Sequence, residues 1–448
     1  MQTSFQPHQL EDPRIREVES ILRRCVHCGL CTATCSTYVM LGDERDSPRG
    51  RIYLMKDMFE KGAPASPEVT FHVDRCLSCL SCMTTCPGGV DYMHLVDHAR
   101  AHIEATGTRS RKQRLIRALL ANLVPYPGRF RRALSLAPLG RPFRRLLERL
   151  GFPELVAMID LAPRLGRRRA RFSGPGTAET RTERQKRVLL LPGCAQQVIR
   201  PEINDSTIRL LARRGVDVVV APGTGCCGAL VHHMGKEALA IAQAKANVDA
   251  WSRAMAKGPI DAIIINASGC GTTVKDYGHL LARVDGYSER ATTVATLTRD
   301  VTEFLTAYDL GAPKRWSSLR VAYHSACSMQ HGQRISDEPK ALLRKAGFTV
   351  LDVPESHICC GSAGVYNILQ PELAGELRKR KVGHIESVRP DLIAAGNLGC
   401  ITQIGLGTEV PIIHTVELLD WAYGGPVPTG LEGFKSFVTD VPGSAAAA

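Results

Sequence analysis

The 16 cysteines of this chain constrain it more than any other feature, because they fall into two groups with regular internal spacing. Eight precede residue 87, none lies between residues 87 and 193, and eight follow. In the first group the spacing C-x2-C-x2-C-x3-C occurs twice, as Cys25, Cys28, Cys31, Cys35 and as Cys76, Cys79, Cys82, Cys86. Structural free thiols have no reason to keep one spacing twice, so metal binding is the leading explanation.

This spacing is typical of a domain with two [4Fe–4S] clusters, in which a short loop supplies three thiolates to one cluster and its fourth cysteine to the other. On that wiring, cluster 1 takes Cys25, Cys28, Cys31 and Cys86, and cluster 2 takes Cys76, Cys79, Cys82 and Cys35. A zinc ribbon fits poorly, because one tetrahedral ion needs two well-separated C-x2-C pairs. Ser36 follows the first run where Pro87 follows the second, but neither residue is a ligand.

The second group of cysteines is also duplicated. Each half reads C-x31-C-C-G with a fourth cysteine about forty residues later: Cys194, Cys226, Cys227, Cys270 and then Cys327, Cys359, Cys360, Cys400. The first three positions recur at a distance of 133 residues. So regular a repeat indicates one structural unit used twice.

Each unit alternates strand-like and helix-like stretches, which predicts parallel α/β structure. The predicted strands are Arg187–Leu191, Val216–Ala221 and Ile260–Asn266, then Arg320–His324, Thr349–Val353 and Asp391–Ala395. The predicted helices are Glu202–Arg214, Lys236–Ala254, Pro339–Lys345 and Pro371–Ser387. All eight cysteines follow a strand, so the thiols of each unit should converge at the carboxyl edge of its sheet.

What those thiols hold is left open by the sequence. Ala267 and Asn397 stand where a fuller form of the motif would add a further cysteine. An additional iron–sulfur cluster in at least one unit, a zinc ion or no metal, and a redox-active dithiol are the three alternatives. Histidines near the loops, such as His324, are expected to pack or to hydrogen-bond the backbone. The glycines Gly223, Gly225 and Gly228 match a dinucleotide fingerprint only weakly, and we expect neither a flavin site nor a catalytic residue on this chain.

The excess charge of the protein lies in its cysteine-free middle. Residues 109–187 hold 21 Lys and Arg against five acidic residues, whereas the whole chain has a net charge of +13. Segments such as Phe143–Leu150 read as short amphipathic helices. Such a basic face suits docking to an anionic membrane surface or to an acidic partner, and the alternative is a merely solvated linker. Nucleic acid is not expected, because no recognition motif accompanies the charge.

These patterns together predict a multidomain α+β and α/β chain. We expect an N-terminal α-helical ferredoxin-type domain with two [4Fe–4S] clusters (1–105), a basic helical linker (106–186), two tandem α/β CCG repeats (187–312 and 313–430) and a flexible tail (431–448). No apolar run is long enough for a transmembrane helix and no signal peptide is visible, so we expect a cytoplasmic protein, peripheral to the membrane at most.

The twin cysteine runs ahead of twin CCG units resemble the iron–sulfur subunits of glycolate oxidase (glycolate dehydrogenase). The stretches Cys359–Asn367, Gln370–Gly375, Ala395–Ile404 and His414–Trp421 are similar to that family in particular. A wider set with the same layout includes the iron–sulfur subunits of lactate-utilising and anaerobic glycerol-3-phosphate dehydrogenases, and heterodisulfide reductase.

The resemblance implies an electron-transfer subunit of a flavin-dependent oxidoreductase. FAD-binding oxidase subunits of the same complex would oxidise glycolate to glyoxylate, and this chain would carry the electrons toward the quinone pool or another membrane acceptor. The alternatives are a thiol–disulfide redox subunit of the heterodisulfide reductase type, a lactate or glycerol-3-phosphate dehydrogenase subunit, and a zinc scaffold without redox chemistry.

Overall fold

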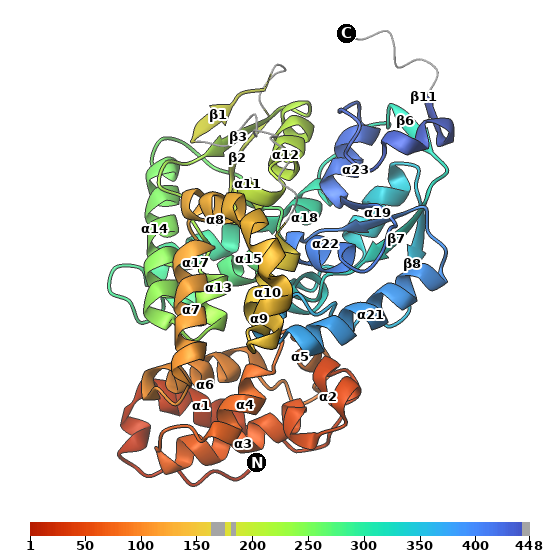
Figure 1. Cartoon of the computed structure of the whole chain (residues 1–448). Coiled ribbons are helices and arrows are strands. Elements are labelled where there is room, and N and C mark those ends of the chain that lie inside the picture. The colour runs from red at the N-terminus through yellow and green to blue at the C-terminus, as the bar shows by residue number, and fades with distance from the viewer. Residues whose placement is uncertain (163–174, 181–184, 441–448) are drawn as a thin grey trace.

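The computed structural model describes residues 1–162, 175–180 and 185–440. It has three parts: a helical N-terminal domain at the bottom of Figure 1, a first repeat at the upper left and a second repeat at the right. The predicted fold class is confirmed. Parts of the predicted basic linker (163–174 and 181–184) and of the predicted tail (441–448) lie outside the described residues. The predicted domain boundaries remain predictions.

The ferredoxin-type domain is a bundle of short helices around two cysteine loops. Its helices are α1 (Pro13–Arg23), α2 (Ser36–Leu41), α3 (Pro48–Lys61), α4 (Pro67–Asp74), α5 (Ser81–Thr85) and α6 (Tyr92–Thr106), with 3-10 turns at Gln9–Glu11 and Glu44–Asp46. Asp12, Ser47 and Ser66 cap α1, α3 and α4, each followed by a proline at the first helical position. Proline is favoured there because its missing N–H would be unpaired in any case.

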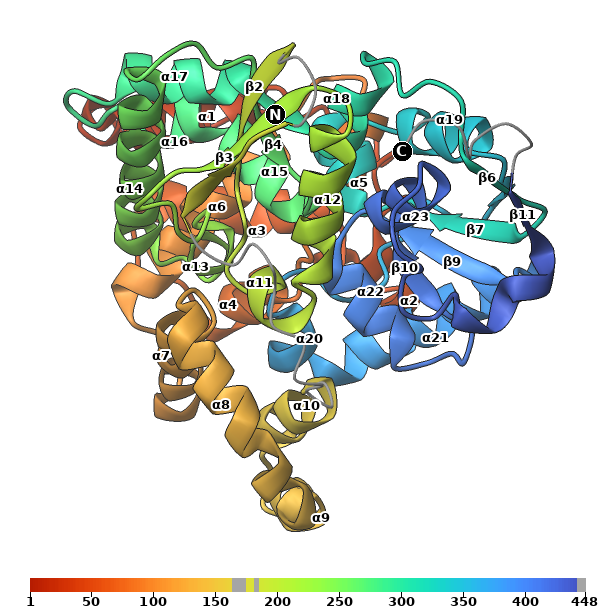
Figure 2. The same cartoon turned by 90° about the horizontal axis from the view of Figure 1, so that it is seen from above.

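The predicted basic linker is helical where it is described. It forms α7 (Arg111–Leu123), α8 (Pro127–Gly140), α9 (Arg144–Arg149) and α10 (Pro153–Leu161), with a 3-10 turn at Arg141–Phe143 between α8 and α9. Helix α7 packs against the first repeat through Ile116, Leu120 and Ala121. Seen from above, α8 and α9 extend away from the rest of the molecule (Figure 2).

The first repeat contains a five-stranded sheet in the order β1-β3-β2-β4-β5. Its strands are β1 (Gly176–Ala178), β2 (Lys186–Leu190), β3 (Val216–Val220), β4 (Ala262–Ile265) and β5 (Thr298–Asp300). Its helices are α11 (Gln196–Ile199), α12 (Glu202–Ala212), α13 (Ala229–His233), α14 (Glu237–Met255), α15 (Ser268–Lys275), α16 (Tyr277–Leu280), α17 (Ser288–Leu297) and α18 (Val301–Thr306). All pairs are parallel except β1 with β3.

The second repeat has a four-stranded parallel sheet in the order β10-β9-β7-β8. Its strands are β7 (Arg320–His324), β8 (Thr349–Asp352), β9 (Leu392–Ala395) and β10 (Ile412–His414). Its helices are α19 (Glu338–Lys345), α20 (Tyr366–Leu369), α21 (Pro371–Ser387), α22 (Leu398–Gly405) and α23 (Thr415–Ala422), with a π-helical turn, η4, at Ser328–Gln333. A 3-10 segment covers Glu432–Phe437, and β6 (Arg315–Ser317) pairs with β11 (Val438–Asp440) in a small antiparallel sheet.

The two repeats share one apolar core. Strand residues of both sheets, such as Val188 and Val321, belong to the same buried cluster. The guanidinium groups of Arg209 on α12 and of Arg213, directly after that helix, contact the buried Asp420 carboxylate on α23. The six predicted strands are confirmed, whereas β1, β5, β6, β10 and β11 were not predicted because each is only three residues long.

Candidate metal centres

The thiols predicted to hold cluster 1 surround one cavity. Cys25, Cys28, Cys31 and Cys86 all line it, together with Cys82, Pro48 and Tyr92. The loop that carries them is open to solvent on one side, since the Cys28 side chain is exposed and Val26 is 72% exposed. Burial raises the pKa of the Cys31 thiol to about 11, so a metal has to displace its proton to bind.

The thiols predicted to hold cluster 2 surround a second cavity. Cys35, Cys76, Cys79 and Cys82 line it. The assignment of Cys35 and Cys86 to the cluster of the opposite loop remains a prediction. Both cavities share the lining residues Pro48, Cys82 and Tyr92, so the two cavities are adjacent. Eight thiols in two adjacent cavities are the soft donor set that iron–sulfur clusters require, so the residues fit such groups.

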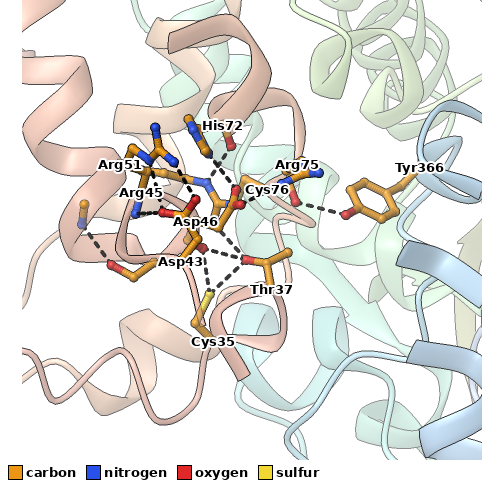
Figure 3. Close-up of polar contacts among 12 residues, drawn as sticks. Cys35, Thr37, Asp43, Arg45, Asp46, Arg51, His72, Arg75, Cys76 and Tyr366 are labelled. Atoms are coloured by element: carbon orange, nitrogen blue, oxygen red, sulfur yellow. Dashed lines mark hydrogen bonds and ion pairs between the residues drawn. The ribbon is translucent and has the colours of Figure 1, made fainter. Parts of the chain in front are cut away.

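A buried ionic network supports the second cavity (Figure 3). The Asp46 carboxylate accepts hydrogen bonds from Arg51 at 3.0 Å and from Arg75 at 2.9 Å, and lies 3.1 Å from Nδ1 of His72. Burial alone would disfavour the charge of Arg51, but Cys76 and Asp46 nearby keep its pKa above the ordinary value. A fully buried cation therefore lies beside the thiols of this cavity, where it would offset the negative charge of a thiolate-bound cluster.

The same network continues to the thiols. The Thr37 hydroxyl donates to the backbone carbonyl of Asp46 at 2.7 Å and lies 3.2 Å from the Cys35 sulfur, and the backbone N–H of Ser78 donates to the Cys76 sulfur at 3.4 Å. Backbone N–H groups and charges around the sulfurs are the means by which a protein tunes the potential of a cluster. This network could not be predicted from the sequence, because no spacing relates Asp46, Arg51 and His72.

Ser36, which follows the first cysteine run, contacts the second repeat. Its buried hydroxyl accepts a hydrogen bond of 3.0 Å from the backbone N–H of Cys359 in the second repeat. A proline at this position, as in the second cysteine run, could not accept that bond. The departure from the ferredoxin pattern thus coincides with a contact between two domains.

The four thiols of the first repeat converge at the carboxyl edge of its sheet, as predicted. They contact one another in the order Cys194, Cys226, Cys227, Cys270. The Asn247 side chain braces the turn by accepting from the backbone N–H of Gly225 and donating to the Cys226 carbonyl.

The four thiols of the second repeat converge in the same way. The sulfurs of Cys327 and Cys359 lie 3.8 Å apart, and the thiols of Cys359, Cys360 and Cys400 follow in contact. Asn397, which occupies the place of the missing cysteine, donates from Nδ2 to the Cys400 sulfur at 3.4 Å. The backbone N–H of Gly361 donates to the Cys359 sulfur at the same distance.

His324 packs in the interior of the second repeat, in line with the expectation for the histidines near these loops. Its side chain is buried, and its Nε2 has no hydrogen-bond partner among the described residues. A ring nitrogen of His324 and the sulfurs of Cys360 and Cys400 all lie within 4.8 Å of one another. Burial, with the Lys381 ammonium nearby adding to it, lowers the pKa of His324 to about 3, so the imidazole is neutral.

The second repeat lies directly against the second cavity. Cys79 and Cys327 both pack on the apolar cluster that contains Leu77, Cys359 and Tyr366. The Tyr366 hydroxyl donates to the backbone carbonyl of Arg75 at 3.0 Å (Figure 3).

No helix in the described ranges of the chain is long and apolar enough to span a membrane.

Family models match three segments of the chain. A 4Fe-4S dicluster domain matches residues 24–90, and a cysteine-rich domain, CCG, matches residues 188–275 and 321–405. These segments include all 16 cysteines. The chain therefore contains the domain type that carries 4Fe-4S clusters, followed by two cysteine-rich domains.

Comparison with whole protein sequences agrees with these domain matches. The chain is 38% identical to the glycolate oxidase iron–sulfur subunit of Escherichia coli K12 over 94% of this chain and 99% of that protein. It is 31% identical to the probable glycolate oxidase iron–sulfur subunit of Bacillus subtilis 168, over 91% and 95%. Lactate utilization protein A of Geobacillus kaustophilus is 26% identical but matches only 52% of this chain, though 98% of its own length. With both its domain order and almost its whole length matched, this chain belongs to the family of glycolate oxidase iron–sulfur subunits.

Proposed function

We propose that the chain is the electron-relay subunit of a flavin-dependent glycolate-oxidising complex. It holds two [4Fe–4S] clusters, one on Cys25, Cys28, Cys31 and Cys86 and the other on Cys76, Cys79, Cys82 and Cys35. Electrons from FAD on partner subunits pass through them toward the quinone pool. The observation that carries this proposal is the pair of adjacent cavities, each lined by the four thiols of one predicted ligand set.

The arrangement also supports a direction for the relay. The first cavity opens to solvent beside the exposed Cys28 and Val26, where a partner subunit can approach it. The second cavity lies under the second repeat, with Cys79 and Cys327 in one apolar cluster. Electrons exchanged with a partner at cluster 1 would therefore reach cluster 2 through the shared wall at Cys82 and Tyr92.

The test starts with the chain produced anaerobically together with its flavin-binding partner subunits. We expect about eight irons per chain from the N-terminal domain. Glycolate should reduce the clusters in the complex, giving a paramagnetic signal that Cys79→Ser diminishes. The chain alone should not oxidise glycolate with a dye acceptor. Turnover by the isolated chain, or a colourless protein with no iron, would contradict the proposal.

We also propose that helices α8 and α9 form a peripheral docking arm for the membrane surface. Leu136, Leu139, Phe143, Leu146 and Leu150 are each more than half exposed on this arm, among arginines. Apolar side chains interleaved with cations suit an anionic lipid surface. Sedimentation with vesicles should show binding to phosphatidylserine-containing bilayers that Leu139→Ser with Phe143→Ser reduces, and equal recovery with neutral vesicles would contradict it.

A further inference from the structure

Arg100 on helix α6 is a buried cation without a carboxylate partner. It is only 4% exposed, and among the described residues no Asp or Glu oxygen lies within 4.0 Å of its guanidinium nitrogens. The other arginines buried in the described part of the chain, Arg51, Arg109 and Arg117, each have such a partner. Burying a charge without a partner is costly, so the position of Arg100 calls for an explanation.

The guanidinium group of Arg100 is directed at the loop of the second cavity. Its Nη2 donates to the backbone carbonyl of Cys76 and its Nη1 to the Ser78 hydroxyl, each at 2.6 Å. One turn earlier on α6, Oδ1 of the buried Asp97 has no hydrogen-bond partner among the described residues, yet Arg100 does not pair with it. The cation therefore faces the loop that carries the thiols of cluster 2 rather than a carboxylate.

The bond to Ser78 also holds a strained part of this loop. The φ angle of Ser78 is 48°, in the left-handed region that a side chain disfavours. In this conformation its backbone N–H donates to the Cys76 sulfur at 3.4 Å. Hydrogen bonds to the sulfurs are one of the means by which a protein sets the potential of a cluster. Arg100 can thus act both through its charge and by positioning this N–H group.

The first repeat covers Arg100. Helix α6 lies on the side of the ferredoxin-type domain that meets this repeat (Figure 1), and a Cβ on Gly235 would lie only 2.3 Å from the Arg100 carbonyl oxygen. His233 and Met234 of the same segment line one cavity together with Arg100 and Cys76. A charge acts more strongly where bulk water is kept away, because the local dielectric constant is low. The first repeat thereby strengthens the effect of this cation on the loop.

The first cysteine loop is arranged differently. His27 takes the place of Ser78 there and has a similar φ of 56°. Arg49 donates to its backbone carbonyl at 3.4 Å, but the Arg49 side chain is 34% exposed and pairs with Glu44. A charge that a carboxylate offsets and water reaches has little effect on its surroundings. Arg100 has neither the carboxylate nor the exposure.

We infer that Arg100 raises the reduction potential of cluster 2, as a buried cation and by positioning the N–H group of Ser78. A cluster with four thiolate ligands becomes more negative on reduction, so a fixed cation beside it stabilises the reduced state. The first repeat contributes to this potential by covering Arg100. The inference rests on the proposed function, since it requires the clusters to be present.

The experiment is a redox titration of the whole chain, followed by electron paramagnetic resonance. Cys79→Ser identifies which of the two reduction steps belongs to cluster 2. We expect Arg100→Gln to lower the equilibrium constant for reduction of cluster 2 at least tenfold, or about 59 mV for one electron, with cluster 1 unchanged. Arg100→Lys keeps the charge and should restore part of that shift. Ser78→Ala removes only the hydroxyl contact and should give a smaller shift in the same direction.

The matched control is Arg14→Gln, which removes an exposed cation from the contact with the same repeat and should change neither potential. Unchanged potentials in an iron-replete Arg100→Gln chain overturn the inference, as do equal shifts of both clusters. A shift in Arg100→Lys as large as in Arg100→Gln overturns it too, because the charge would then have no effect. If Arg100→Gln loses iron, Ser78→Ala decides: a lowered potential supports the inference and an unchanged one overturns it. An unaltered chain without iron would instead contradict the proposed function.

Discussion

The ferredoxin-type domain meets the two repeats in different ways. Toward the second repeat it presents buried, mostly uncharged contacts: the Ser36 hydroxyl with the Cys359 backbone, Tyr366 with the Arg75 carbonyl, and an apolar cluster around Leu77. Toward the first repeat it uses ion pairs, which range from partly buried to exposed. These are Arg14 with Glu237, Glu104 with Lys236, His94 with Asp276, and Glu17 with His279 and Arg283.

The two kinds of contact do different things: one holds two domains together, and the other fixes the distance between groups on either side. Ion pairs that solvent can reach hold two domains together, but they contribute little stability and salt screens them. A buried contact fixes the separation of the groups across it, because close-packed side chains resist displacement. The second cavity is thus held rigidly against the second repeat, as the proposed relay requires of two neighbouring redox or metal sites.

The largest effect is expected from Asp46→Asn, on the side of the second repeat. The change leaves the buried Arg51 without its carboxylate partner, which should lower the free energy of unfolding by about 3–5 kcal/mol. Denaturant unfolding under anaerobic conditions measures this. The matched control is Glu44→Gln, which removes the partner of the half-exposed Arg49 and should change stability by less than about 1 kcal/mol. Equal effects would show that burial is not what distinguishes the two pairs.

A smaller effect is expected from Ser36→Ala. It leaves the buried N–H of Cys359 without an acceptor, which should destabilise the chain by about 1–3 kcal/mol. The same denaturant titration measures it, with the exposed Ser135→Ala as control. If Ser36→Ala or Ser36→Pro left the stability unchanged, this hydrogen bond would not stabilise the interface.

Tyr366→Phe should have a milder effect, since it removes one hydrogen bond and keeps the ring in place. The Arg75 carbonyl loses its donor, and we expect a loss of about 1 kcal/mol. The exposed Tyr53→Phe is the control and should be neutral. If both variants unfold at the same denaturant concentration as the unaltered chain, Tyr366 contributes packing alone.

The stability of the contact with the first repeat should also depend on pH. Burial alone would lower the pKa of His94, but its contacts with Asp276 and Asp91 outweigh burial and raise it to about 10. Because the folded pKa is raised, the stabilisation is complete below pH 6.5 and is lost as the pH rises toward 10. Hydrogen exchange should show α6 and α16 loosening over that range, and His94→Gln should abolish the dependence. A dependence that survives in His94→Gln would assign it to another group.

Much of the fold was predictable from residue patterns. The alternation of strand-like and helix-like stretches predicted the strands β2, β3, β4, β7, β8 and β9. Runs such as Val216–Val220 are buried on both faces and hence mostly apolar, with Asp217 as the one polar residue of that run. The three-residue strands β5 and β10 carry too little pattern to be recognised. The edge strand β1 pairs antiparallel with β3, and no repeat or spacing in the sequence indicates this pairing.

For the candidate sites, too, some features could be predicted from the sequence and others only from the tertiary structure. The cysteine spacing by itself predicts which thiols belong together, since a short loop of this kind supplies three thiolates to one cluster and its fourth to the neighbouring cluster. The repeat of 133 residues by itself determined that one α/β unit is used twice. Only the tertiary structure decided what surrounds those thiols: the buried Arg51 and Asp46, the Ser36 contact, and the imidazole of His324 beside Cys360 and Cys400. Ligands close in sequence leave a spacing that can be read, whereas partners brought together by packing leave none.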